Sequence, residues 1–295
     1  MLTGPWDVAA AALAALGFAA VCQSAGSVLF AVLWHGRMGG SERRVRRLGA
    51  AAAGLGIGIV AVRTMLEPAH LSGVAAGIVD PSLQMLVITS GIGAAASLRL
   101  TGLTLIAIGV GRNSRGGDVA AIIGAVACCL SFGLIGHTEA SPARALLLPL
   151  LTAHLLLAAF WFGALVPLRM VLRHETTDIA GAVLADYSRL AVWLVPAIAL
   201  AGGTMLCVLA DPLAAVPASG WGRLTLLKLA VFTALMGFAA LNKQRLVPRL
   251  AAGDASAVRA LRTSIACEIG LILLVFATTA VITGFFAPPG AEAAG

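Results

Sequence analysis

The chain has 295 residues, of which 60% are hydrophobic and only 11% are charged. Soluble domains carry about 25% charged residues, so this composition excludes an ordinary soluble protein. The formal net charge of +7 does not indicate nucleic-acid binding, because the sequence has no basic domain outside its apolar runs.

The apolar runs predict an all-α polytopic membrane protein. A helix needs about 20 apolar residues to cross the hydrocarbon core of a bilayer, whereas the strands of a membrane β-barrel alternate apolar with polar residues. The runs here are apolar on every face, so we expect eight transmembrane helices. They cover approximately residues 5–34, 48–69, 82–110, 119–136, 144–169, 190–210, 221–241 and 263–286. No basic residue precedes the first run, which we therefore interpret as a retained helix rather than a signal peptide.

The positions of Lys and Arg predict the orientation of these helices. Connections on the cytoplasmic side of a membrane protein are enriched in basic residues. One side holds only Arg144 and Arg223, whereas the other holds Arg37, Arg43, Arg44, Arg46, Arg47, Arg112, Arg115, Arg169, Arg173, Arg189, Lys243, Arg245, Arg249, Arg259 and Arg262. We therefore expect both termini to lie outside the cytoplasm and the basic connections to face anionic lipid.

Two similar segments predict an internal repeat. The third run contains SGIGAAASLRL from Ser90 to Leu100, and the seventh contains SGWGRLTLLKL from Ser219 to Leu229. In both, S-G-x-G is followed by five residues, a basic residue and Leu. Because the runs are four apart, the two four-helix halves, residues 1–143 and 144–295, are predicted to be parallel repeats related by an axis along the membrane normal.

Several charged side chains fall inside the predicted helices. A charge at the centre of the membrane costs about 3 kcal/mol or more, so such residues normally face the interior of a bundle. Arg99 and Lys228 lie within the third and seventh runs, and Glu268 lies near the cytoplasmic end of the last. We expect these charges to belong to an intramembrane network that includes Asn242 and Arg245.

Short blocks of sequence recur in order through the C-terminal half of the chain. They are GH at 136–137, HLL at 154–156, FWFGALVPL at 160–168, GRL at 222–224, KL at 228–229, LNK at 241–243, RLVPRL at 245–250, Glu268 and PP at 288–289. Together, in this order and spacing, they resemble the copper resistance protein D (CopD) family of bacterial inner-membrane proteins.

The resemblance implies an eight-helix copper-transport protein in the bacterial inner membrane. In that membrane, the basic connections described above would place both termini in the periplasm. The resemblance also implies a role beside a soluble periplasmic copper-binding partner of the CopC type. We expect copper ions to pass from periplasm to cytoplasm, which would contribute to copper homeostasis or resistance.

Three histidines in the outer half of the predicted bundle, His70, His137 and His154, are the candidate copper ligands, because imidazole binds both oxidation states of copper. His154 lies about 15 Å from the start of its helix, below His137 at the outer surface. Candidate auxiliary ligands are Met65, Met85, Met205, Cys207 and Glu139, and the carboxylates expected at the entrance are Glu67, Asp80 and Glu139. Alternatively, His154 only bonds a backbone carbonyl, His137 caps a helix end, His70 lies in a loop and the methionines only pack.

Two other functions stay open. A haem-binding electron-transfer protein would use histidines as axial ligands, and a scaffold for copper-enzyme assembly would bind a partner without moving copper. The sequence contains no Walker loop, H-E-x-x-H motif or Ser-His-Asp arrangement, so we do not expect an enzyme.

Overall fold

A computed structural model describes residues 4–112, 114–210 and 212–289 of the chain. Within these ranges the protein is helical and contains no β-strand. The elements in chain order are α1 (Pro5–Leu33), α2 (Ser41–Ser72), η1 (Ala75–Val79), α3 (Pro81–Thr89), α4 (Gly91–Arg112), α5 (Arg115–Ser131), η2 (Phe132–Leu134), α6 (His137–Ala140), α7 (Arg144–His174), α8 (Thr177–Leu209), η3 (Leu213–Ala218), α9 (Gly220–Leu241), η4 (Asn242–Leu246), α10 (Val247–Ala251) and α11 (Ala255–Phe285).

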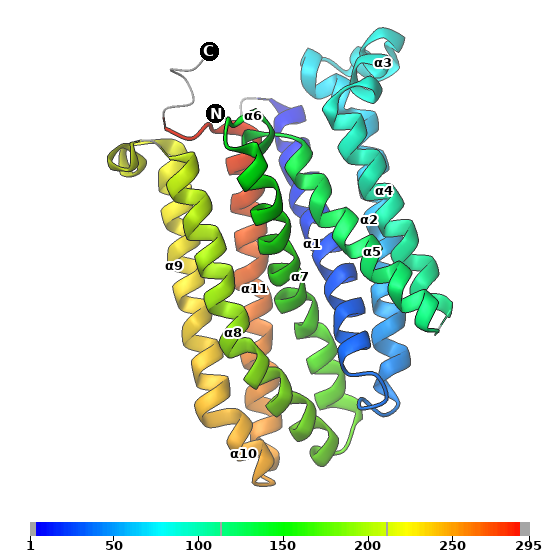
Figure 1. The fold of residues 1–295 in the computed structure, drawn as a ribbon, viewed down its shortest axis with the longest axis vertical. Coiled ribbons are helices and arrows are strands. Elements are labelled where there is room, and N and C mark those ends of the chain that lie inside the picture. The colour runs from blue at the N-terminus through cyan, green and yellow to red at the C-terminus, as the bar shows by residue number, and fades with distance from the viewer. Residues whose placement is uncertain (1–3, 113, 211, 290–295) are drawn as a thin grey trace.

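Eight helical segments, counted over the described residues, are long and apolar enough to cross a membrane. The predicted all-α class and number of spans are therefore confirmed, and the chain is a multi-pass membrane protein. Figure 1 shows the long helices in one bundle, with the start of α1 and the end of α11 at the same end. We call this end, where α3 and α6 also lie, the termini end. The opposite end, at α10 and the turn between α7 and α8, is the basic end; it carries Arg37, Arg43, Arg44, Arg173, Arg245 and Arg249.

Helix α1 is central in the bundle and packs against α2, α7 and α11. Of its most apolar stretch, 61% is buried inside the protein, against 11% for the segment that begins with α9. Gly26 of α1 crosses Gly163 of α7 so closely that a β-carbon on Gly26 would lie 2.6 Å from the Cα of Gly163. Such small residues let helices pack in a membrane, where lipid removes the hydrophobic drive for helix association.

The prediction of a single helix over residues 82–110 is wrong, because the helix is interrupted at Ser90, between α3 and α4. Ser90 has an extended backbone, with φ −84° and ψ 176°. Its hydroxyl donates to the carbonyl of Val87 at 2.8 Å and accepts from the amide of Ile92 at 3.1 Å. These bonds satisfy backbone groups on both sides of the break, which lowers the free-energy cost of interrupting a helix within an apolar run.

The same local structure begins α9, where the hydroxyl of Ser219 accepts from the amide of Gly222 at 2.9 Å. Carbonyl groups of the preceding turn leave no room for a side chain at Gly93 or Gly222. Arg99 and Lys228 each follow eight residues after the first residue of their helix, which is about 12 Å along its axis. The two repeat segments therefore share a local structure, while the parallel arrangement of the two halves stays a prediction.

Helices α8 and α11 begin at residues 177 and 255, well before the predicted starts at 190 and 263. Their N-caps explain the difference. The hydroxyl of Thr176 accepts from the backbone three residues on, at 3.4 Å, and Asp254 Oδ1 accepts from the amide of Ser256 at 2.8 Å. Because a cap satisfies an amide that has no partner in the first helical turn, the polar sequence before each apolar run stays helical.

Helix α9 continues beyond its predicted end through the π-helical turn η4 into α10. The amide of Val247 bonds the carbonyl of Asn242, five residues back. Pro248 follows and has no N–H to give to the carbonyl of Gln244, which explains why the helix widens here. Single π-helical turns are frequent at functional sites, and this one carries Asn242.

Polar contacts fasten the basic end of the bundle. Arg46 of α2 pairs with Asp118 of α5 at 2.7 Å, and the hydroxyl of Ser41 donates to Glu175 at 2.5 Å. Glu175 therefore places a carboxylate at the N-terminus of α2, where the helix dipole favours negative charge. These contacts hold α2 against α5 and against the turn between α7 and α8.

Candidate functional site

Two of the candidate histidines lie at the termini end, beside the last turn of α11. Nε2 of His137 is 2.8 Å from the carbonyl oxygen of Phe286. The ring of His70 meets the ring of Phe285 edge-on, with centroids 6.2 Å apart. Nδ1 of His70 also lies 3.2 Å from Oδ1 of Asp7 at the start of α1. The end of α11 thus places His70 and His137 in one region of the protein.

The third candidate, His154, lies within α7 and is half-buried. Its Nδ1 is 3.1 Å from the carbonyl oxygen of Ile198 in α8. The ring packs on Gly202, where a β-carbon would lie 3.2 Å from Cε1 of the histidine, so α8 makes room for it by lacking a side chain. Lys228 of α9 is near enough to interact electrostatically with His154. Helices α7, α8 and α9 therefore all contribute to its surroundings.

The hydrogen bonds of His137 and His154 fix the proton on each ring. A carbonyl oxygen only accepts, so Nε2 of His137 and Nδ1 of His154 must donate. The second nitrogen of each neutral ring then keeps a lone pair. Metal-binding histidines characteristically donate their other N–H to a carbonyl or carboxylate. Both rings are therefore compatible with metal binding, and equally with a purely structural hydrogen bond.

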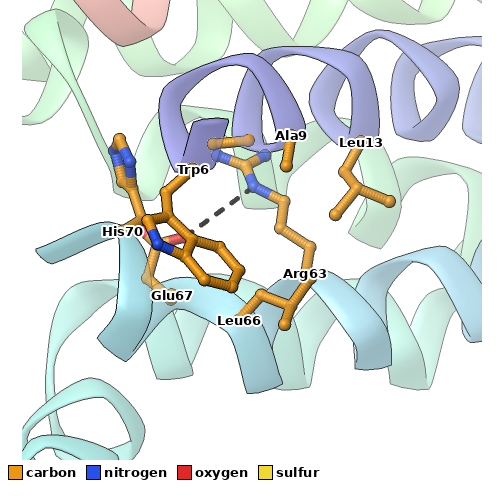
Figure 2. Close-up of a pocket in the computed structure, with 8 residues that line it drawn as sticks. Trp6, Ala9, Leu13, Arg63, Leu66, Glu67 and His70 are labelled. Atoms are coloured by element: carbon orange, nitrogen blue, oxygen red, sulfur yellow. Dashed lines mark ion pairs between the residues drawn. The ribbon is translucent and has the colours of Figure 1, made fainter. Parts of the chain in front are cut away.

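A narrow pocket between α1 and α2 holds His70. Figure 2 shows Trp6, Arg63, Glu67 and His70 around it, with the ion pair between Nε of Arg63 and Oε2 of Glu67 at 4.0 Å. The pocket measures ≈ 10 Å³, which is about the volume of one water-sized sphere. It is therefore large enough for a water molecule or a small ion and too small for a larger solute.

The three carboxylates expected at the copper entrance each interact with another group of the protein. Glu67 faces Arg63, and Glu139 pairs with Arg144 at 2.8 Å. Asp80 caps α3 by accepting from the amide of Ser82 at 2.8 Å. Because two of the three have a cationic neighbour, the termini end attracts cations less strongly than three free carboxylates would.

The candidate ligands are not gathered into one centre. Among the described residues, no group of three or more His, Cys, Asp or Glu side chains lies close enough to hold one metal ion. Met65 and Met85 are 59% and 62% exposed, Cys207 is exposed, and Met205 is half-buried. The candidates thus occupy separate positions in the bundle and do not form a single coordination shell.

Arg99 of α4 lies apart from the other predicted network residues. Its Nε donates to the hydroxyl of Ser131 at 2.9 Å, and its guanidinium carbon lies 3.8 Å from the centre of the Phe132 ring. Sequence reasoning missed both partners, because a serine and an aromatic residue at the end of a neighbouring apolar run carry no pairing signal. Arg99 is only 6% exposed; these contacts satisfy part of its guanidinium group, while Nη2 is buried without a hydrogen-bond partner among the described residues.

The structure does bring Asn242 and Glu268 together, because Nδ2 of Asn242 donates to Oε1 of Glu268 at 2.6 Å. This bond joins the π-helical turn to α11. Lys228 forms no hydrogen bond or ion pair among the described residues, and Arg245 is exposed at the basic end. Of the five residues in the predicted network, only this pair forms a direct contact among the described residues.

Comparison with known proteins shows what the chain is similar to. Residues 181–282 match the family model described as copper resistance protein D. A relative named copper resistance protein D, from Pseudomonas syringae pv. tomato, is 27% identical over 260 residues, covering 80% of this chain and 84% of the relative. Both matches show that the chain is similar to copper resistance protein D. The resemblance found in the sequence is confirmed, and no solved structure matches the chain.

The region that matches the family model begins in α8 and ends in α11. It contains Lys228 and the Asn242–Glu268 pair, whereas His70, His137 and His154 precede it. The match to the family model therefore lies in the half of the bundle with the π-helical turn, and the histidines are candidates on their chemistry and position alone.

Proposed function

We propose that this protein transports copper ions across the bacterial inner membrane, importing them from periplasm to cytoplasm. The observation that carries the proposal is the match to the copper resistance protein D family model in a chain with eight membrane-length helices. The termini end faces the periplasm and the basic end faces the cytoplasm, because basic connections of membrane proteins lie on the cytoplasmic side.

Copper, as the cargo, enters at the termini end beside His137 and His70 and passes to His154. The free lone pairs of His137 and His154 support these two steps. Imidazole accepts either valence of copper, and the thioethers of Met65, Met85 and Met205 are auxiliary ligands near the entrance. The ligands act in sequence and not as one shell, which suits a moving ion better than a tightly held one.

A soluble periplasmic copper-binding protein of the CopC type delivers copper to the termini end. The protein itself catalyses no chemical reaction in this proposal, so a gradient or a partner supplies the energy for uptake. The net result is a contribution to copper homeostasis or resistance.

Cellular copper content tests the proposal. Cells that express the protein are expected to accumulate more cytoplasmic copper than cells that lack it, with zinc content unchanged. Equal copper in both would contradict import. Purified protein that shows a Soret band would instead favour the haem-binding alternative, and copper-enzyme assembly without copper flux would favour the scaffold.

A further inference from the structure

Glu268 is a buried carboxyl group with few polar contacts to offset the cost of burying it. It is 3% exposed and lies within α11. Over the described residues it receives one hydrogen bond, from Asn242, and forms no ion pair. Tyr187 of α8 interacts with it electrostatically, but the hydroxyl of Tyr187 donates to the carbonyl of Trp161 at 3.3 Å. A buried negative charge is costly unless it is paired, so a positive charge is required here.

Two neighbouring oxygen atoms are also buried without a partner, namely Oδ1 of Asn242 and Oγ of Ser264. Ser264 is 5% exposed and precedes Glu268 by one helical turn, so both lie on the same face of α11. A serine within a helix commonly returns its hydroxyl to the carbonyl four residues back, and Ser264 does not. Buried polar groups are normally bonded, so these unpaired oxygens indicate a missing ligand.

A pocket near the basic end borders this cluster at Ser264. It measures ≈ 470 Å³, lies between α9, η4 and α11, and is lined by Ser264. Leu241 and Cys267 also line it, and they directly precede Asn242 and Glu268 in the chain. Ser264 therefore lies between the pocket and the buried carboxyl group of Glu268, one helical turn further along α11.

The donor set identifies the class of ion. Carboxylate, amide and hydroxyl oxygens suit hard cations, whereas copper prefers sulfur and imidazole. A single carboxylate balances a single positive charge, and divalent calcium would need about six to eight oxygen ligands. The charged residue on the pocket wall, Arg259, is exposed and forms no ion pair with Glu268 in the described part of the chain.

We propose that Glu268, Asn242 and Ser264 form a binding site for one monovalent cation, Na⁺ or a proton, separate from the copper path. Occupation neutralises Glu268, and Na⁺ additionally takes Oδ1 of Asn242 and Oγ of Ser264 as ligands. A coupling role, in which release of this cation toward the basic end accompanies copper movement, rests on the proposed transport function; the binding site itself does not.

Binding measurements on the purified full-length protein test the site without copper. One arm measures ²²Na⁺ binding at pH 8 in choline chloride. The other records the infrared carbonyl stretch of a protonated carboxylic acid at pH 7. The variants are Glu268→Gln, which keeps the shape of the side chain, Ser264→Ala, and the control Glu139→Gln at the opposite end. Copper uptake is measured separately, so failure of transport and failure of this site are distinguishable.

For a sodium site, we expect one Na⁺ per chain, with binding lost in Glu268→Gln and weakened about tenfold in Ser264→Ala, equivalent to about 1.4 kcal/mol. For a proton site, we expect a carboxylic-acid band that disappears in Glu268→Gln and persists in Glu139→Gln. If Glu268→Gln does not fold, Ser264→Ala is used in both measurements. Weaker Na⁺ binding in Ser264→Ala then supports a sodium site, and a shift of its carboxylic-acid band supports a proton site. A protein that binds no Na⁺ and holds Glu268 as a bare carboxylate at pH 7 would overturn the proposal.

Discussion

Replacing Gly26 with alanine is expected to push α1 and α7 apart. The added β-carbon would lie 2.6 Å from the Cα of Gly163 and 2.9 Å from the carbonyl carbon of Ala159. Both are backbone atoms, so no change of rotamer relieves the clash. Overpacking costs about 1–3 kcal/mol, and we use the upper value because the backbone itself must move. Alanine regains about 1 kcal/mol through its higher helix propensity, which leaves a net loss of about 2 kcal/mol.

Unfolding of the purified protein in mixed micelles of increasing SDS content, followed by circular dichroism, measures this loss. Gly58→Ala in α2 is the matched control, because a β-carbon there meets nothing within 4 Å. The control is expected to keep or slightly raise the free energy of unfolding. If Gly26→Ala is as stable as Gly58→Ala, the close crossing of α1 and α7 is refuted.

Two further predictions concern single polar contacts. Ser131→Ala leaves Nε of the buried Arg99 without its 2.9 Å partner and is expected to lower the free energy of unfolding by about 1–3 kcal/mol; unchanged SDS unfolding would show that the contact contributes nothing. Hydrogen bonds from Ser256 and then Arg249 hold the pKa of Asp254 at about 2, below its ordinary 3.8. Because the folded pKa is the lower one, its stabilisation is complete above pH 3.8 and is lost as the pH falls through 2. The stability difference between wild type and Asp254→Asn should therefore shrink toward pH 2, and a difference independent of pH would contradict this assignment.

The sequence predicted the class and number of spans because burial in lipid demands long apolar runs, and that demand is visible residue by residue. The break at Ser90 was not predictable from hydropathy, since one serine hydroxyl satisfies the backbone inside an otherwise continuous run. The π-helical turn was missed for a related reason. Pro248 was visible in the sequence, but proline more often ends a helix than widens it.

Position along a helix was predictable, whereas lateral pairing was predicted correctly for one pair only. The rise per residue placed His154 about 15 Å from the start of its helix, and the predicted network included Asn242 and Glu268, which form a hydrogen bond. Arg99 was expected in the same network, but it pairs with Ser131, 32 residues along the chain. Which helix faces which depends on contacts such as that of Gly26 with Gly163, which composition does not encode.

Copper flux into sealed liposomes that contain only the purified protein tests the central claim most directly. Wild-type protein is expected to admit copper faster than protein-free liposomes, and His154→Ala and His137→Ala are expected to slow this flux. His174→Ala is the matched control, because His174 is exposed at the basic end of the same helix as His154. Normal flux in both histidine variants would refute the assigned path, and wild-type flux no faster than that of protein-free liposomes would contradict copper transport itself.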